Sequence, residues 1–338
     1  MCESTMIGER ATLSEGTKGE ERAILHESTN SIERAISPEG TKQQERKREV
    51  VTMGDAEFDA MTVAALTSEL KGEARHMERD EARFLVDAYY QVQKYRKTAG
   101  NQVRAGGQGD VRAFAIVDYV QNHMAAIETR IKLLLKHYAA ADPVGEWSMS
   151  ICGIGPVISA GLLAHIDIER APTVGHIWSF AGLNPEQTWE KGERRPWNAR
   201  LKNLCWHIGQ CFMKTHNNEN SFYGPLYVRR KAYEVERNET GGNADAAAAK
   251  VTAHPQHKQR EIYAEGKLPP GQIEARACHW AAKLFLAHWH HVAYECHYGE
   301  PPPKPYIIDR GNHAHIMGPP NWPMEAATNK SRSATAAS

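Results

Sequence analysis

Apolar residues recur at helical spacing through the middle of the chain, most clearly over residues 110–139. Two sets of apolar side chains there each repeat every seven residues. They are Val117, Met124, Ile131 and Tyr138 in one register, and Val120, Ile127 and Leu134 in the other. This heptad pattern is typical of a helix that packs along a partner helix. It predicts either a short coiled coil that joins two copies of the chain through residues 117–138, or a helix that packs within its own domain.

Three further segments show the same helical spacing. Residues 55–99 are expected to end at the glycine-rich stretch before Asp110. The apolar face of this helix is predicted to consist of Phe84, Ala88, Val92 and Tyr95. Residues 198–213 carry the apolar stripe Leu201, Leu204, Cys205, Ile208 and Phe212. Residues 273–297 form the last amphipathic segment. We therefore predict an all-α fold, arranged as a helical bundle.

Polar composition marks both ends of the chain and one internal segment. Residues 9–46 repeat a Glu-Arg motif every 12 residues and hold few apolar side chains, so residues 1–54 are expected to form a disordered arm. Residues 238–258, with paired glycines and an alanine run, are expected to be a linker or an insertion. Residues 306–338 are expected to form an extended and then disordered tail. Two helical regions remain between these segments, at 55–146 and 147–305.

A glycine-cornered turn lies early in the second helical region. Gly153 and Gly155 flank Ile154, and Pro156 follows, in a position that suits the first turn of a helix. Glycines allow a positive φ or a close approach of the backbone to another chain. The pattern predicts a helix-hairpin-helix, in which the free backbone N–H groups of Gly153, Ile154, Gly155 and Val157 bind a phosphate.

The charge of the chain is balanced, but its distribution is uneven. Lys and Arg number 41, as do Asp and Glu, so the formal net charge is zero. Residues 190–231 are basic, which predicts either a phosphate-binding surface or a solvated basic face. The candidate nucleic-acid-binding side chains in that stretch are Arg194, Arg195, Arg200, Lys202, Arg229, Arg230 and Lys231. Trp189 and Trp197 could stack on an unpaired base or pack in the core.

These motifs stand in an order that resembles a known family. The hairpin, the helix Leu162 to Arg170 and the Ser179 to Pro185 element resemble the C-terminal helix-hairpin-helix domain of insertion-sequence transposases of the "one-ten" family. Those proteins are DEDD-type recombinases guided by a bridge RNA. The resemblance extends over residues 110–305, so 147–305 is expected to be a transposase-like domain and 117–138 a dimer-forming coiled coil.

The resemblance also implies two catalytic features. One is an RNase-H-like domain whose acidic residues bind magnesium, but residues 1–110 lack the apolar strand patterns of that fold. The other is a nucleophilic serine, and the matching position holds Trp189, with Thr188 beside it as a weak candidate. We therefore expect no catalytic residues and no cofactor, with magnesium required only if the chain is an active recombinase.

Three groups of histidine, cysteine and glutamate residues are candidate metal sites. The candidate groups are His288, His291 and Glu295; Cys205, His207 and Cys211; and Cys278 with His279. None has the spacing of a zinc site, so no metal is expected. The six cysteines form no CxxC pair, and no signal peptide or membrane-spanning run is recognised. The expectation is a cytoplasmic, nucleoid-associated protein with reduced thiols.

The function that these patterns favour is binding without catalysis. We expect a protein that binds DNA, or else structured RNA, through the sugar-phosphate backbone. A domesticated transposase fragment or a mobile-element accessory factor would have this composition. The alternatives are an active transposase that performs DNA strand exchange, and a helical scaffold for protein interactions in which the hairpin only packs helices.

Overall fold

The computed structural model describes residues 64–106, 115–303 and 317–324. Within those residues every regular element is a helix and no strand is present. The prediction of an all-α fold is confirmed for this part of the chain. The arm at 1–54 and most of the tail at 306–338 lie outside the described residues.

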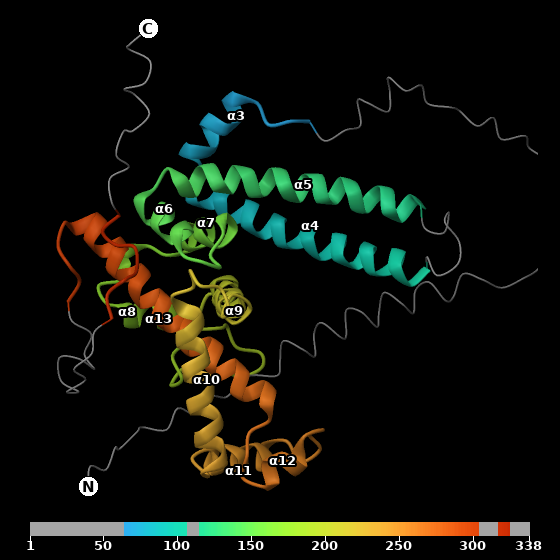
Figure 1. Cartoon of the computed structure of the whole chain (residues 1–338), viewed down its shortest axis with the longest axis vertical. Helices are drawn as coiled ribbons and strands as arrows, with labels where there is room; N and C mark the ends of the chain where they lie inside the picture. Colours follow the sequence, from blue (N-terminus) through green and yellow to red (C-terminus); the bar gives the residue numbers. More distant parts are fainter. Residues whose placement is uncertain (1–63, 107–114, 304–316, 325–338) are drawn as a thin grey trace, which may run out of the picture.

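Two long helices lie side by side and antiparallel at one side of the molecule (Figure 1). They are α4 (Arg79–Gly106) and α5 (Ala115–Ala140). The short helices α3 (Ser68–Glu73) and η2 (Ala74–His76) pack against α5, and Thr67 caps α3 through its hydroxyl. Arg96 of α4 forms an ion pair with Glu128 of α5 at 2.5 Å, which fixes the pairing of the two helices.

The heptad pattern on α5 separates into two environments. Ile131, in the first register, is buried between α5, α4 and α7. The second register faces outward in the first half of α5, where Val120 and Ile127 are each about two-fifths exposed. The partner of the first register is therefore α4 of the same chain, which is the second of the two arrangements that the pattern allowed.

The predicted apolar face of α4 is wrong for Phe84 and Tyr95, whereas Ala88 and Val92 are partly buried and pack against the core between α4, α5 and α7. Phe84 and Tyr95 are 69% and 63% exposed, whereas Ala82 and Val86 are buried. The helix packs through the opposite side because α5 and α7 both contact the face that carries Ala82 and Val86. The helix also continues through Gly100 to Gly106, so Gly100 does not end it.

The helix α7 (Pro156–His165) occupies the centre of the fold. It follows α6 (Pro143–Ser150), whose N-terminus is capped by the carboxylate of Asp142. It packs against α4, α5, α6 and α9 (Ala199–Lys214). A Cβ on Gly161 would lie 2.8 Å from a methyl carbon of Leu204, so glycine is needed for the close approach of α7 to α9.

The main core lies between α7, α9 and the two helices that cover them. These are α10 (Tyr223–Glu239) and α13 (Pro270–Tyr298). The predicted stripe of residues 198–213 is confirmed, because all five of its apolar side chains are buried. The short η3 (Ile168–Arg170) and α8 (Val174–Phe180) close one side of this core against α13.

A small third core lies at the far end of α10 and α13 (Figure 1). It is built by α11 (Ala244–Ala253) and α12 (Arg260–Ala264), which pack on each other. Its buried side chains are Ala247, Tyr263, Leu268 and Ile273. The segment at 238–258 is therefore largely helical, because its alanine run has a high helix propensity and an apolar face to bury.

The described part of the tail crosses α6 and α13. The indole Nε1 of Trp147 donates to the carbonyl of Pro320 at 2.8 Å, and the amide of Asn321 donates to the carbonyl of Ser150 at 3.3 Å. The indole Nε1 of Trp322 donates to Glu295 at 2.8 Å. Residues 317–324 are thus packed on the bundle without forming a helix.

No described helix combines the length and the apolar character that crossing a membrane requires.

Candidate nucleic-acid interface

The glycine turn, residues 151–155, joins α6 to α7. Gly153 has a φ of +95°, and the amide of Ile154 donates to the carbonyl of Ile151 at 2.9 Å. A Cβ on Gly153 would lie 3.2 Å from the hydroxyl of Thr215, just beyond the end of α9. A Cβ on Gly155 would meet nothing within 4 Å, so that side of the turn is open.

The predicted phosphate-binding positions in the turn divide into two kinds. The side chains of Ile154 and Val157 are buried in the core, so they can only anchor the turn. Gly153 and Gly155 are half-buried and expose backbone. The turn therefore offers backbone groups alone to a phosphate and no charged side chain of its own.

The loop of residues 184–198 holds three basic and three acidic residues; we call it the basic loop after Arg194 and Arg195, although Glu186, Glu190 and Glu193 are also exposed on it. The loop is organised by its two tryptophans. The indole Nε1 of Trp189 donates to the carbonyl of Glu193 at 2.7 Å, and the guanidinium of Arg195 lies 5.0 Å from the centre of the Trp189 ring. A cation over an aromatic face is attracted by the ring quadrupole. Arg194 is exposed beside this pair, so the loop presents two guanidinium groups at its surface.

The basic loop leads directly into α9. Asn198 caps this helix by accepting from the amides of Arg200 and Leu201 at 3.0 and 3.1 Å. The ammonium of Lys202 lies 4.2 Å from the centre of the Trp197 ring. Burial, and then the positive charge of Arg195, lower the pKa of Lys202 from its ordinary value. Lys202 and Arg195 therefore lie close enough to form one positive surface.

Trp197 has a structural role in placing this surface. Gly182 has a φ of +65°, and a Cβ at that position would lie 2.7 Å from the Trp197 ring. The amide of Asn198 donates to the carbonyl of Phe180 at 2.8 Å, which holds the end of the loop against α8. Trp189 and Trp197 are both half-buried, and each carries a cation on one face. They are therefore neither fully packed in the core nor fully free to stack on a base, the two roles that the sequence left open.

The basic residues of α10 do not form one cluster. Arg229 is exposed. Arg230 forms an ion pair with the buried Glu234, which also binds Arg276 at 2.9 Å. Lys231 forms an ion pair with Glu274 at 2.5 Å. Contact of Arg230 with a phosphate stays a prediction, and the structure shows its guanidinium bound to Glu234 inside the fold.

The glycine turn and the basic loop lie at opposite ends of α9. Gly153 approaches Thr215, whereas Lys202 sits 13 residues earlier on the same axis, which is about 20 Å at 1.5 Å per residue. At this separation the backbone groups of the turn and the cations of the loop cannot contact the same phosphate. Arg229 is one of the predicted cations and lies on α10. The first turn of α10 contacts the Thr215 region through Gly224.

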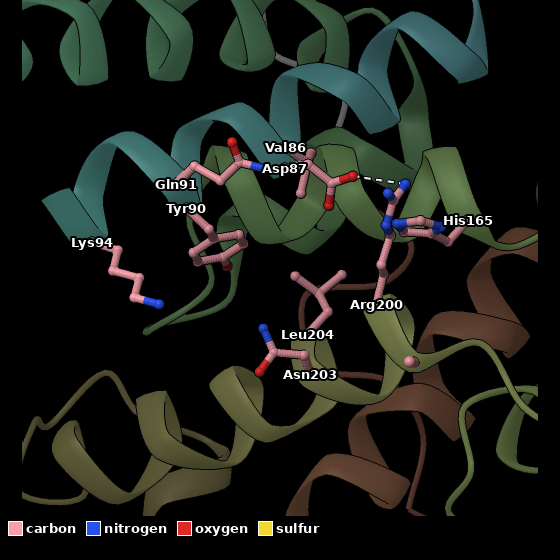
Figure 2. A pocket seen from close by; sticks show the side chains of 10 residues that line it. Val86, Asp87, Tyr90, Gln91, Lys94, His165, Arg200, Asn203 and Leu204 are labelled. Atoms are coloured by element: carbon pink, nitrogen blue, oxygen red, sulfur yellow. Dashed lines mark ion pairs between the residues drawn. The ribbon is translucent and has the colours of Figure 1, made fainter. Parts of the chain in front are cut away.

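A groove of about 380 Å³ lies between α4 and the first half of α9 (Figure 2). Arg200 crosses it to form an ion pair with Asp87 at 2.7 Å. Burial raises the pKa of Asp87, and the charge of Arg200 opposes this shift. Burial, followed by the charges of Arg83 and Arg200, lowers the pKa of His165 to about 4, so this histidine is neutral at pH 7.

The sequence did not reveal this groove. Asp87 and its partner Arg200 lie far apart along the chain, on helices from two separate helical regions. Lys94 and Gln91, which line the groove, belong to a face of α4 that carries no apolar pattern. A pairing between two distant helices leaves no periodic signal in one sequence.

The described residues contain no group of three or more His, Cys, Asp or Glu side chains placed to hold a metal ion. His288 is buried and bonds to the Tyr223 hydroxyl at 2.7 Å and to the Met317 carbonyl at 2.9 Å. His291 and Glu295 lie 3.4 Å apart. Thr188 is exposed in the basic loop.

Comparison with known proteins finds a similarity for one part of the chain. The family model described as "Transposase IS116/IS110/IS902 family" matches residues 146–223, which run from within α6 to the first residue of α10. No curated protein and no solved structure matches the chain. The glycine turn and the basic loop both fall inside the matched segment. Residues 146–223 are therefore a transposase-related segment, similar to that family.

Proposed function

We propose that this protein binds nucleic acid, and DNA in the first place, through its sugar-phosphate backbone and without cleaving it. The basic loop and the first turn of α9 supply the main contact surface. The observation that carries this proposal is the joined positive surface of Arg194, Arg195 and Lys202 inside the transposase-related segment.

Geometry and charge together support this assignment. Arg195 and Lys202 are held over tryptophan rings, so less side-chain freedom is lost when they meet a phosphate. Arginine forms paired hydrogen bonds with phosphate oxygens. The glycine turn provides a second and separate set of backbone groups, about 20 Å from Lys202 along α9. The nucleic acid would therefore contact two places on one helix axis.

The proposal predicts a salt-dependent affinity that the basic loop controls. Binding of a labelled duplex, measured by fluorescence anisotropy at several salt concentrations, should weaken steeply as salt rises. The double variant Arg194→Ala/Arg195→Ala removes two phosphate contacts. It should bind more weakly, and the slope of log K against log salt should become shallower by about 1.8, at about 0.9 per contact.

A matched pair of charge deletions controls for net charge. Lys258 and Arg260 are exposed near α12 and form no ion pair within the described residues. The variant Lys258→Ala/Arg260→Ala should keep the slope of the unaltered protein. An equal loss in both double variants would show non-specific attraction only. No binding even at low salt would leave the scaffold alternative as the better account.

Strand exchange is the competing activity, and Thr188 is its only candidate nucleophile from the sequence. Thr188 is exposed and has no hydrogen-bonding base among the residues that the structure describes. We expect neither cleavage nor a covalent protein–DNA adduct when the protein is incubated with duplex DNA and Mg²⁺. An adduct that Thr188→Ala abolishes would replace the binding proposal with the recombinase.

We further propose that two copies of the chain associate through α5. One stripe of this helix carries Ile116, Val120 and Ile127, which are 81%, 40% and 39% exposed. The C-terminal part of the same helix is covered by α3 and η2, so the open stretch is its first half. An exposed apolar stripe at helical spacing is typical of a helix-to-helix interface.

This proposal predicts a loss of self-association when charge enters the stripe. Val120→Glu/Ile127→Glu should shift the mass measured by light scattering from a dimer to a monomer. The helical content should stay unchanged, because both side chains are partly exposed in the single chain. The exposed and polar Lys132→Glu, on another face of α5, is the control. A monomeric unaltered protein would contradict the proposal.

A further inference from the structure

The helices that form the walls of the α4–α9 groove carry few acidic residues. Helix α9 has no acidic residue, and α4 has none after Asp87. Lys94 lies at the end of the groove away from the ion pair of Asp87 and Arg200 (Figure 2). Among the described residues Lys94 has no ion-pair partner. The only acidic group of the groove is therefore already neutralised, and a cation remains free.

The basic character continues along the same two helices. Burial lowers the pKa of His207, and the charges of Lys97 of α4 and Lys214 of α9 lower it further. Both lysines therefore lie near His207. Within the described part of the chain Lys97 bonds only to the side-chain oxygen of Gln93, at 2.8 Å. Cations thus line the joint between α4 and α9 from Arg200 to Lys214, a length of about 21 Å at 1.5 Å per residue.

Aromatic rings and amides accompany these cations. The rings of Tyr90 and His207 are stacked across the joint, with centres 4.7 Å apart and planes 5° apart. Trp206 meets the edge of His207 at 4.9 Å and is 49% exposed. The amide side chains of Gln91 and Asn203 line the groove and form no hydrogen bond with the described residues.

We propose that the α4–α9 groove binds an unpaired stretch of a nucleic-acid strand. The phosphates lie against Lys94, Lys97 and Lys214, and one base stacks on Trp206 at the rim. The free amides of Gln91 and Asn203 meet polar base edges. Basic grooves with aromatic stacking groups are the general solution for binding single strands, whereas a duplex hides its base edges and faces. This inference rests on the proposed nucleic-acid binding and adds the form of the ligand.

The groove begins directly after the basic loop, at Ala199 and Arg200, but Lys94, Asn203 and Trp206 lie outside the loop, so the two surfaces can be altered by different substitutions. The probes are a blunt DNA duplex and the same duplex with a single-stranded thymidine tail. The unaltered protein should bind the tailed duplex more tightly, by about 5-fold or more, as expected for one stacked base. Trp206→Ala and Asn203→Leu, which change no charge, should remove this advantage and leave the affinity for the blunt duplex unchanged.

Further variants separate the groove from the basic loop. Lys94→Ala should also reduce the advantage of the tail, whereas the matched control Lys132→Ala on α5 should not. Arg194→Ala/Arg195→Ala should weaken both probes alike. Quenching of tryptophan fluorescence by the free oligothymidine should be smaller in Trp206→Phe than in the unaltered protein.

Two results would overturn one proposal without the other. Equal affinity of the unaltered protein for the two probes would refute the groove and leave backbone binding in place. A tail advantage that survives in Trp206→Ala and Asn203→Leu would place the strand elsewhere. Absence of binding to either probe at low salt would refute the proposed function itself.

Discussion

At the scale of single residues, His288 is a buried polar side chain with a hydrogen-bond partner at each ring nitrogen. Its Nδ1 faces the Tyr223 hydroxyl and its Nε2 faces the Met317 carbonyl. A carbonyl only accepts, so Nε2 carries the proton and Nδ1 accepts from Tyr223. Burial lowers the pKa of His288 to about 4, with the Met317 bond acting in the opposite sense. The neutral ring satisfies both partners.

This pairing predicts a loss of stability in acid. The folded pKa lies below the ordinary value of about 6.5, so the unfolded chain binds the proton more readily. The free energy of unfolding should therefore fall as pH drops from about 6.5 towards 4, by about 1.4 kcal/mol per pH unit from this residue. Urea unfolding at several pH values would measure the slope.

The variant His288→Gln isolates this contribution. Glutamine cannot gain the proton, so the fall between pH 6.5 and 4 should become shallower. It should not vanish, because the pKa of His165 is also lowered to about 4. His254→Gln, at an exposed position, is the control and should keep the original slope. An unchanged slope in His288→Gln would contradict the assignment.

Residue roles were the least predictable part of the molecule. Arg230 belongs to a basic run in the sequence, yet Glu234 one turn later takes its guanidinium into the fold together with Arg276. The count of basic residues does not distinguish these cases, because an ion pair depends on which side chains face each other. The cations over Trp189 and Trp197 could not be predicted for the same reason.

At the scale of elements, the close packing of helices depends on a few glycines. Gly209 of α9 lies against α13, where a Cβ would be 2.8 Å from the Cys278 carbonyl oxygen and 2.9 Å from its Cβ. The first of these atoms belongs to the backbone of a helix and cannot rotate away. The spacing of α9 and α13 is therefore set by the absence of one methyl group.

This contact predicts a clear difference between two glycine substitutions. Gly209→Ala should lower the free energy of unfolding by about 1–3 kcal/mol, because the helices must separate to admit the methyl group. Gly72→Ala in α3, where a Cβ meets nothing within 4 Å, should be neutral or stabilising by up to about 1 kcal/mol. Thermal unfolding would measure both, and equal effects would contradict the account.

Elements were predictable where the pattern was complete. Helix α9 was expected at 198–213 and is observed at Ala199–Lys214, because its five apolar residues and the Asn198 cap agree. The face of α4 was not, because Phe84 and Tyr95 happen to keep helical spacing on its exposed side. A long polar helix with two partners, α5 and α7, contains too few apolar residues to identify its buried face.

At the scale of the whole molecule, α7 joins the paired long helices to the main core. One side of it packs with α4 and α5, and another with α9. The sequence indicated the all-α class and the start of a helix at Pro156. It gave no sign of the groove between α4 and α9, since that depends on how two separate helical regions dock. The transposase-related segment supplies one wall of this groove, and α4, outside the match, supplies the other.

The packing of residues 317–324 on α6 and α13 has a consequence for the stability of the protein. Residues 317–324 accept or donate hydrogen bonds to Trp147, Ser150, His288 and Glu295, which belong to α6 and α13. Removal of residues 317–324 would delete none of the described helices, but it would remove Trp322 and Met324 from the edge of the main core and leave the Trp147 and His288 ring nitrogens without their acceptors. Residues 317–324 thus hold α6 and α13 together, and a version of this protein without them would begin to loosen beside the glycine turn.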